Sequence, residues 1–164
     1  MTPVKENPIR ILLVDDEADL VEFLARLLLK RGYTVTATNS GPEAIEAVEV
    51  QTFDVAIVDL KMPQMDGIEV LQKIRTIQPY LEVIMLTGHG SPESALEAGR
   101  LKAFRYLLKP YKIEELLEQI QEAYEQRENV LNTAYEEEIM ESISPGHTPK
   151  DILARCEELR RKYD

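Results

Sequence analysis

Five short apolar runs, each followed by a helical pattern, constrain the fold of this chain more than any other feature. The runs have the length and composition of buried strands, and they occupy residues 9–14, 33–37, 55–58, 82–86 and 104–108. Strands that alternate with helices in this way form right-handed crossovers and a parallel sheet with helices on both faces. The sequence therefore predicts a three-layer, doubly wound α/β domain over residues 8–124, with the strand order 2-1-3-4-5.

The helical patterns between the runs carry apolar residues at helical spacing, with glycine or proline near several of their ends. The first pattern has five apolar residues on one broad face, namely Leu20, Phe23, Leu24, Leu27 and Leu28. Gly32 ends this helix, Pro42 lies near the start of the second, and Pro79 ends the third. The fourth helix, over about residues 91–101, is short and only weakly apolar.

Composition excludes several classes of protein. No apolar run approaches the roughly 20 residues that span a bilayer, and the N-terminus lacks the apolar core of a signal peptide. Cys156 is the only cysteine, so an internal disulfide is excluded and a reducing, cytoplasmic location is expected. The formal net charge of -11 argues against direct binding to nucleic acid or to an anionic membrane, because such binding needs a positive surface.

Polar residues follow four of the five predicted strands. They are Asp15 and Asp16 after the first, Asp59 after the third, Thr87 at the end of the fourth and Lys109 after the fifth. Taken alone, Asp59 could equally cap a turn. In the order 2-1-3-4-5, however, the first and third strands are neighbours, so three carboxylates would crowd together where such sheets build their sites. A divalent cation is the usual remedy for that repulsion, and oxygen ligands favour Mg²⁺ or Mn²⁺ over zinc.

Four motifs resemble those of the receiver domain of response regulators in bacterial two-component systems. They are Val14-Asp15-Asp16-Glu17, Asp59-Leu60-Lys61-Met62-Pro63-Gln64-Met65-Asp66-Gly67, Leu86-Thr87-Gly88 and Tyr106-Leu107-Leu108-Lys109-Pro110. The resemblance covers residues 8–124 and implies the flavodoxin-like fold of chemotaxis regulators. It also implies a phosphorelay function, in which a phosphohistidine of a sensor histidine kinase or phosphotransfer protein donates a phosphoryl group to an aspartate.

The resemblance assigns roles to residues of this chain. Asp59 would be the phosphoacceptor and, with Asp16, would ligate Mg²⁺ through its side chain. Lys61 would add its backbone carbonyl, and Asp15 would act mostly through water.

Four further residues receive roles in the same way. Lys109 would pair with a phosphoryl oxygen and Thr87 would hydrogen-bond another, while Thr87 and Tyr106 together would form the switch. Lys61 and His89, each two residues beyond a site residue, would influence the lifetime of the phosphate, although His89 could equally be an ordinary exposed loop residue.

The output implied by the resemblance is a protein contact rather than a second enzymatic activity. Self-phosphorylation and autodephosphorylation would be the only reactions, and the face made by the fourth helix, fifth strand and fifth helix would change its affinity for an unidentified downstream protein. A homodimer could form through this face or through the C-terminal helices. Lys102 and Arg105 lie near this face, where the family often has glycine and aspartate; Lys102 would be mildly strained if its φ were positive.

Three alternatives compete with this interpretation. The chain could be the receiver portion of a longer transcription regulator. It could also be a phosphatase with an aspartyl nucleophile, but that chemistry generally needs a carboxylate two residues later, where this chain has Lys61. A flavodoxin-type FMN carrier would share the fold, but the three clustered carboxylates would repel its phosphate.

Residues 125–164 are predicted to form a helical extension. A helical pattern without Gly or Pro continues to about Ser142, and the stretch 144–149 breaks it. Thr148 then resembles an N-cap with Pro149 at the first helical position. Ile152, Cys156, Leu159 and Tyr163 recur near heptad spacing, which is compatible with a helical hairpin, a dimerising coil or a helix packed on the receiver. Cys156 is expected to pack rather than to react, as are Met62 and Met65 in their loop.

Overall fold

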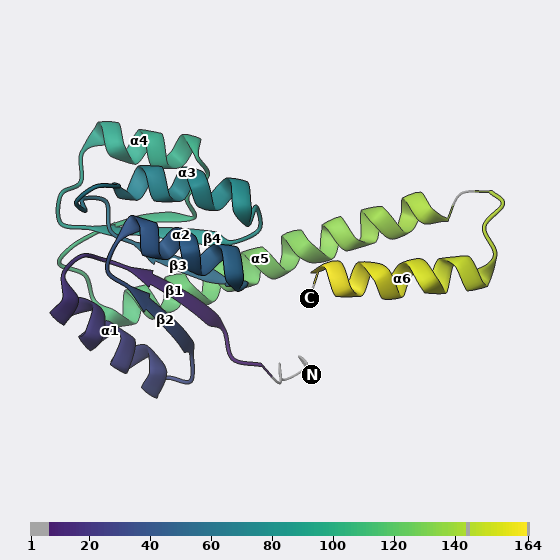
Figure 1. The fold of residues 1–164 in the computed structure, drawn as a ribbon, viewed down its shortest axis with the longest axis horizontal. Coiled ribbons are helices and arrows are strands. Elements are labelled where there is room, and N and C mark those ends of the chain that lie inside the picture. The colour runs from purple at the N-terminus through teal and green to yellow at the C-terminus, as the bar shows by residue number, and fades with distance from the viewer. Residues whose placement is uncertain (1–6, 144, 164) are drawn as a thin grey trace. The chain divides into compact units, whose positions relative to one another are not determined.

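The computed structural model describes residues 7–143 and 145–163, which fold into two compact units. The first unit ends at Tyr124 and the second begins at Glu125. The strands are β1 (Arg10–Val14), β2 (Thr34–Thr38), β3 (Val55–Val58), β4 (Glu82–Thr87) and β5 (Arg105–Leu108) (Figure 1). The helices are α1 (Ala18–Lys30), α2 (Gly41–Val50), α3 (Gly67–Ile77), α4 (Pro92–Arg100), α5 (Ile113–Ser142) and α6 (Pro149–Tyr163). None of the helices in these two stretches has the length and apolar content that a membrane span requires.

The five strands form one parallel sheet with the order β2-β1-β3-β4-β5, which confirms the predicted topology. The strand bounds differ from the predicted ones by at most one residue at either end. In the register, Val14 lies level with Thr38 of β2 and with Val58 of β3. Because every strand runs in the same direction, the residues that follow these positions emerge at one edge of the sheet.

Helices cover both faces of the sheet, as the continuous apolar run of β3 predicts for a strand buried on both sides (Figure 1). On one face, α2, α3 and α4 pack against Leu12, Ala56 and Val83. On the other face, α1 and the first part of α5 pack against Ile11 and Ile57. Alternate residues of each strand therefore enter two separate hydrophobic clusters, and the result is the three-layer architecture.

The buried face of α1 is narrower than the apolar face of its sequence. Val21, Leu24 and Leu28 are buried against the sheet. Leu20 and Phe23 lie on the flank of the helix and remain 44% and 66% exposed. The apolar face of this helix is wider than the surface that the sheet can cover, so residues at its edge remain exposed to water. Periodicity alone does not show which edge is exposed.

The second unit contains the end of α5 and the whole of α6. Helix α5 continues to Ser142, as the sequence pattern predicted. Thr148 caps α6, because its hydroxyl accepts a hydrogen bond from the amide of Asp151 at 3.3 Å while the Asp151 carboxylate accepts one from the amide of Thr148 at 2.9 Å. The predicted start of α6, with Pro149 in its first turn, is therefore confirmed.

Polar contacts join α5 and α6 within the second unit. The carboxylate of Glu138 accepts hydrogen bonds from Lys162 and from the hydroxyl of Tyr163, and Arg155 lies 3.5 Å from it. Hydrogen bonds from Lys162 and Tyr163 lower the pKa of Glu138. The rings of Tyr135 and Tyr163 meet edge to face, with their centroids 6.4 Å apart. These contacts link residues of α5 to residues of α6 about 17–28 positions later.

Two neighbouring residues of α1 test its orientation. We expect Leu24→Ala to lower the free energy of unfolding by about 2–5 kcal/mol, because Leu24 is buried and its loss leaves a cavity. Phe23→Ala should change the free energy by no more than about 0.5 kcal/mol, because Phe23 is mostly exposed. Urea unfolding followed by circular dichroism measures both. Equal losses in the two variants would contradict the observed orientation of α1.

Candidate functional site

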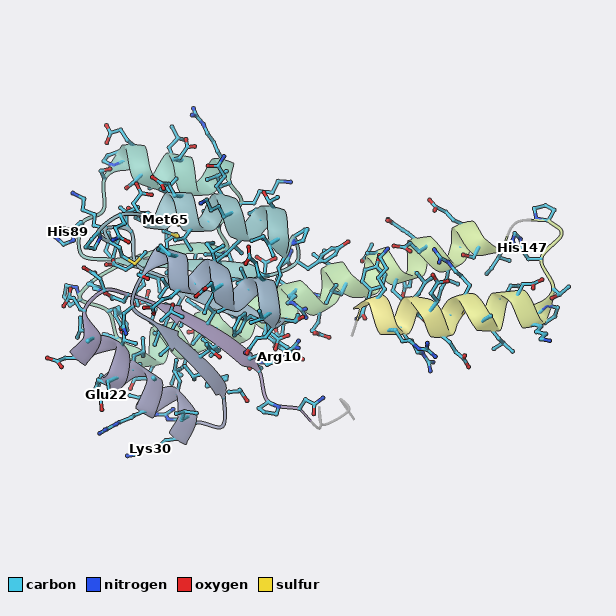
Figure 2. All side chains as sticks on the ribbon, viewed as in Figure 1. Arg10, Glu22, Lys30, Met65, His89 and His147 are labelled. Atoms are coloured by element: carbon cyan, nitrogen blue, oxygen red, sulfur yellow. The ribbon has the colours of Figure 1, made fainter. Side chains whose placement is uncertain are left out.

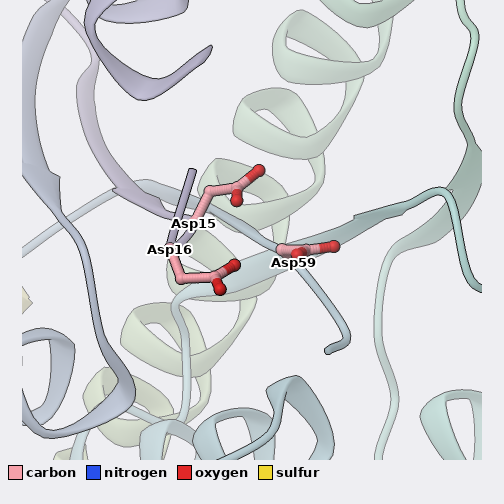
Figure 3. A group of neighbouring side chains, drawn as sticks. All are labelled: Asp15, Asp16 and Asp59. Carbon is pink, nitrogen blue, oxygen red and sulfur yellow. The ribbon is translucent and has the colours of Figure 1, made fainter. Parts of the chain in front are cut away.

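Three carboxylates meet at the carboxyl edge of β1 and β3. Asp15 and Asp16 follow β1, Asp59 follows β3, and the amide of Asp59 donates to the carbonyl of Val14 at 2.8 Å. One carboxylate oxygen from each aspartate lies within 4.8 Å of the other two (Figure 3). Asp15 and Asp59 are buried, whereas Asp16 is exposed. The strand order thus brings together side chains that are 43 or more residues apart in the sequence.

Lys109 reaches the same cluster from the end of β5. Its amide donates to the carbonyl of Thr87 at 2.8 Å, which holds the end of β5 beside the end of β4. Its ammonium group lies 2.9 Å from the carboxylate of Asp15. Thr87 is fully buried, and its hydroxyl lies near enough to Asp59 to lower the pKa of that carboxyl. All five residues that the sequence assigned to this edge therefore lie in one site.

The electrostatics of the site favour a proton or a cation beside Asp59. Burial raises the pKa of Asp59, and the nearby charge of Asp15 raises it further. Lys109 and the hydrogen bonds from Leu60 and Thr87 oppose this shift without cancelling it. Burial lowers the pKa of Lys109, but its hydrogen bond and attraction to Asp15, with help from Asp59 and Glu17, raise that pKa on balance. The charged form of Lys109 is therefore stabilised, whereas the charged form of Asp59 is destabilised.

The loop after β3 holds Asp59 in place. Its carboxylate accepts a hydrogen bond from the amide of Leu60 at 2.9 Å. The amide of Gly67 donates to the carbonyl of Leu60 at 2.7 Å, so the loop returns directly beneath the site. A Cβ atom at Gly67 would collide with the backbone of Asp59 and Leu60, which explains why glycine stands there. Met65, labelled in Figure 2, packs from this loop against the core, as expected.

Two residues expected to influence phosphate lifetime border the site. Lys61 and His89 are both exposed, and His89 projects from the loop after β4 (Figure 2). The amide of His89 donates to the hydroxyl of Thr87 at 3.0 Å. Their kinetic roles stay predictions, since their positions alone show only that both side chains are free to meet solvent or a partner.

Tyr106 lies apart from the carboxylates and contacts a residue that the sequence did not single out. Its hydroxyl lies 2.6 Å from the hydroxyl of Ser94 in the first turn of α4. Ser91 is the N-cap of this helix, in agreement with the predicted start near residue 91, and Ser94 completes a capping box with it. Nothing local indicates the contact with Tyr106, because that contact depends on how α4 packs beside β5.

Lys102 and Arg105 are the two residues near β5 where the sequence departs from the pattern of the family. Lys102 has a φ of 59°, a conformation that a residue other than glycine adopts at some cost. Arg105 lies over the ring of Phe104 and 3.4 Å from Glu122 of α5. Its contacts belong to the face of β5 and α5 and not to the carboxylate site.

A pocket of about 250 Å³ adjoins the site on the side of α1. Asp59 and Lys109 line its polar end, while Leu20, Phe23 and Pro110 line its apolar part. Because Leu20 and Phe23 are not buried against the sheet, their apolar side chains border the site on this side.

The residues of this site can hold a hard divalent cation and a phosphoryl group. Three carboxylates supply oxygen ligands, which Mg²⁺ prefers. Lys109 and Thr87 supply a positive charge and a hydrogen-bond donor that suit the oxygens of a phosphoryl group. Asp59 is buried among these groups, because Asp15, Lys109 and Thr87 all act on its carboxyl.

Comparison with known proteins agrees with this geometry. The profile of the family described as "Response regulator receiver domain" matches residues 11–121. The transcriptional regulatory protein GlrR of Escherichia coli is 34% identical over 137 residues, which are 84% of this chain and 31% of GlrR. The chain thus spans about a third of the length of this relative, and the matched part of the transcriptional regulatory protein ZraR of the same species is 26% of its length.

Solved structures resemble the first unit closely. A CheY-like receiver domain protein from Methanospirillum hungatei is 32% identical with a TM-score of 0.73, over 75% of this chain and 98% of that one. The response regulator TrrA of Thermotoga maritima, solved with Mg²⁺ and a beryllium fluoride, is 31% identical with a TM-score of 0.64, over 70% of this chain and 98% of that one. The family profile covers more than half of the chain and its residues include the carboxylate cluster, so this chain belongs to the response regulator receiver domain family.

Proposed function

We propose that this chain is a phosphoacceptor receiver of a histidine-to-aspartate phosphorelay, with Asp59 as the phosphoacceptor. The observation that carries the proposal is the cluster of Asp15, Asp16 and Asp59 with Lys109 beside it. The donor would be the phosphohistidine of a sensor histidine kinase or of a phosphotransfer protein. Such a donor is cytoplasmic, so the proposal includes a cytoplasmic location.

The carboxylate cluster fits Mg²⁺, with Mn²⁺ as a substitute. All donors are oxygens, and burial together with the charge of Asp15 raises the pKa of Asp59, so that a cation would favour its charged form. Asp16 and Asp59 would bind the ion through their side chains, Lys61 through its backbone carbonyl and Asp15 mostly through water. When bound, the ion would offset the charge of the transferring phosphoryl group.

The transfer uses the remaining groups of the site. A carboxylate oxygen of Asp59 forms a bond to phosphorus while the bond from phosphorus to the donor histidine breaks, and the electron pair stays on the imidazole nitrogen. Lys109 pairs with one phosphoryl oxygen and Thr87 donates a hydrogen bond to another. Water later hydrolyses the aspartyl phosphate. Tyr106 and Thr87 are the switch residues, and Lys61 and His89 adjust the rate of hydrolysis.

The proposal includes no enzymatic activity beyond these two reactions. A phosphatase with an aspartyl nucleophile would need an acid or base two residues after Asp59, and Lys61 at that position is exposed and is not a carboxylate. We propose a protein as the downstream partner. That the chain does not bind nucleic acid directly stays a prediction based on its net charge of -11.

Transcription regulation is the second candidate for the output. GlrR and ZraR are both named transcriptional regulatory proteins, and this chain matches 31% and 26% of their lengths. Those names support the interpretation that the receiver acts as one portion of a longer transcription regulator. A longer reading frame that contains this sequence would favour this output over a stand-alone receiver.

For the C-terminal part, we propose that residues 8–124 act as the receiver domain and that 125–164 form a helical hairpin. The contacts of Glu138 with α6 support a hairpin within one chain, and Leu159 of α6 is fully buried without a second copy. A dimerising coil would have to expose this residue before burying it again. We therefore favour the hairpin over a homodimer through these helices.

Phosphorylation is tested with acetyl phosphate. We expect Mg²⁺-dependent addition of one phosphoryl group per chain, no addition with EDTA and none to Asp59→Asn, because Asp59 lies in the carboxylate cluster with Lys109 and Thr87 near it. Asp19→Asn, which changes an exposed aspartate of α1, is the control and should be labelled like the wild type. Intact-mass spectrometry measures the addition. Equal labelling of Asp59→Asn and wild type would refute the assignment.

The charge crowding at Asp59 predicts a pH dependence of stability. Because burial and Asp15 raise the pKa of Asp59 above 3.8, stability from this group is present below that pH and is lost as pH rises through the folded-state pKa. In EDTA, Asp59→Asn should therefore unfold at higher urea concentration than wild type at pH 7, with the gain disappearing below pH 3.8. Mg²⁺ should stabilise wild type more than the variant. Identical urea midpoints at pH 7 in EDTA would contradict this explanation.

The hairpin predicts the oligomeric state of this chain. We expect analytical ultracentrifugation to give the mass of a monomer, both for the wild type and for a form that ends at residue 125. A dimer that requires residues beyond 125 would show that the C-terminal helices are a dimerising coil. A dimer formed by both lengths would instead indicate the face made by α4, β5 and α5.

A further inference from the structure

The pocket beside the carboxylate site is mostly apolar. Its lining includes side chains of the sheet that are buried, among them Leu13, Ile57 and Leu86. Leu20 and Phe23 of α1 also line it, and they remain 44% and 66% exposed. The pocket therefore combines a fixed apolar floor with apolar side chains that a bound molecule would cover.

Charged groups occupy one end of this pocket. Asp15, Asp59 and Lys109 line that end, and the ammonium group of Lys109 lies 2.9 Å from the carboxylate of Asp15. An anionic group bound here finds its positive partner in Lys109. An apolar cavity in which a few polar groups fix the orientation of the ligand is the usual form of a small-molecule site.

The size of the pocket limits the ligand that it can take. Its volume of about 250 Å³ is slightly below that of the smallest sites for drug-sized molecules, which begin at about 300 Å³. A phosphoryl group with a short apolar chain is smaller than such a molecule. The pocket therefore has room for a ligand of this class.

The chemistry of phosphoryl transfer directs the leaving group of a donor away from the attacking atom. The attacking and leaving oxygens lie roughly in line through phosphorus, so the leaving group points away from Asp59. On the side of α1, the space next to Asp59 and Lys109 is the apolar pocket. An apolar leaving group that extends along α1 would lose contact with water against Leu20 and Phe23, and this burial favours binding.

We propose that the pocket receives the acyl chain of small acyl phosphates, so that this chain prefers donors with a longer apolar acyl group to acetyl phosphate. The preference rests on the proposed function of Asp59 and adds to it the class of small-molecule donor. Leu20 and Phe23 are the residues that determine this specificity. They contact the part of the donor that leaves and take no part in the bond changes at phosphorus.

The reaction with an acyl phosphate needs no further reactant. A carboxylate oxygen of Asp59 forms a bond to phosphorus while the bond from phosphorus to the acyl oxygen breaks. The electron pair stays on the acyl oxygen, and the leaving group departs as a carboxylate without taking up a proton. Contact between the acyl chain and the pocket raises the second-order rate constant, because this contact is present in the transition state.

A series of acetyl, propionyl and butyryl phosphate with Mg²⁺ tests the preference. The three leaving carboxylates have nearly the same basicity, so the series changes the apolar length of the donor. We expect the second-order rate constant of butyryl phosphate to be about tenfold that of acetyl phosphate, since each fully buried methylene is worth about fourfold. Initial rates of labelling at low donor concentration, followed by intact-mass spectrometry, give these constants.

Variants of α1 assign the preference to the pocket. Phe23→Ala should reduce the ratio of the butyryl to the acetyl rate constant from about tenfold to about threefold or less, because part of the apolar lining is lost. Phe23→Leu keeps an apolar side chain and should retain most of the ratio. Leu29→Ala is the matched control, because Leu29 is 54% exposed on the same helix and does not line the pocket. It should keep the wild-type ratio.

The outcomes separate this proposal from the proposed function. Equal rate constants along the series, with labelling of Asp59 by all three donors, would overturn the preference and leave the proposed function standing. An unchanged ratio in Phe23→Ala, or the same reduction in Leu29→Ala, would refute the assignment to this pocket. If none of the three donors labels Asp59, the preference fails together with the proposed function.

Discussion

Repulsion between the buried carboxylates of Asp15 and Asp59 is the constraint on which the rest of the site depends. Both follow strands that are neighbours in the sheet, and the paired backbones of β1 and β3 prevent them from moving apart. Lys109 neutralises part of this charge through Asp15, yet burial and the charge of Asp15 keep the pKa of Asp59 raised. An excess of fixed negative charge favours the binding of a cation. A bound cation would in turn reduce the repulsion between the carboxylates and the oxygens of a phosphoryl group.

The rigidity of the sheet determines where a change at Asp59 can be expressed. β1, β3 and β4 are buried on both faces and joined to their neighbours along their length, so they have little freedom to respond. Helix α4 buries only Ala98 and is attached mainly at its ends. Of the helices that cover the sheet, α4 therefore has the fewest buried residues to hold it in place.

One side chain beside Asp59 separates the receiver interpretation from a hydrolytic enzyme on a similar fold. Hydrolysis of many substrates through an aspartyl intermediate needs an acid or base that acts in each turnover. Lys61, two residues after Asp59, is exposed and is not a carboxylate, so it does not match the residue type that this role generally uses. Slow turnover of a phosphorylated Asp59 is what a signal requires, because the phosphate must last long enough for a partner to bind.

Much of the fold and of the carboxylate site could be predicted from the sequence. The alternation of strands and helices implies the parallel sheet, and the strand order then places Asp15, Asp16, Asp59, Thr87 and Lys109 at one edge. Each of these inferences needs only the local pattern and the general rules of crossover connections. The end of α5 and the cap of α6 were predictable for the same reason, since both are set by residues within a few positions.

Contacts between distant residues were decided only by the tertiary structure. The flank of α1 that carries Phe23 stays in water because the sheet covers only part of an apolar arc. The hydrogen bond between Tyr106 and Ser94 and the one from Arg75 to the carbonyl of Lys102 join residues that are 12 and 27 positions apart in the sequence. Sequence periodicity by itself determined which segments are strands and helices and which ends of strands carry charge. The side-chain contacts between these segments depend on packing distances that no local pattern encodes.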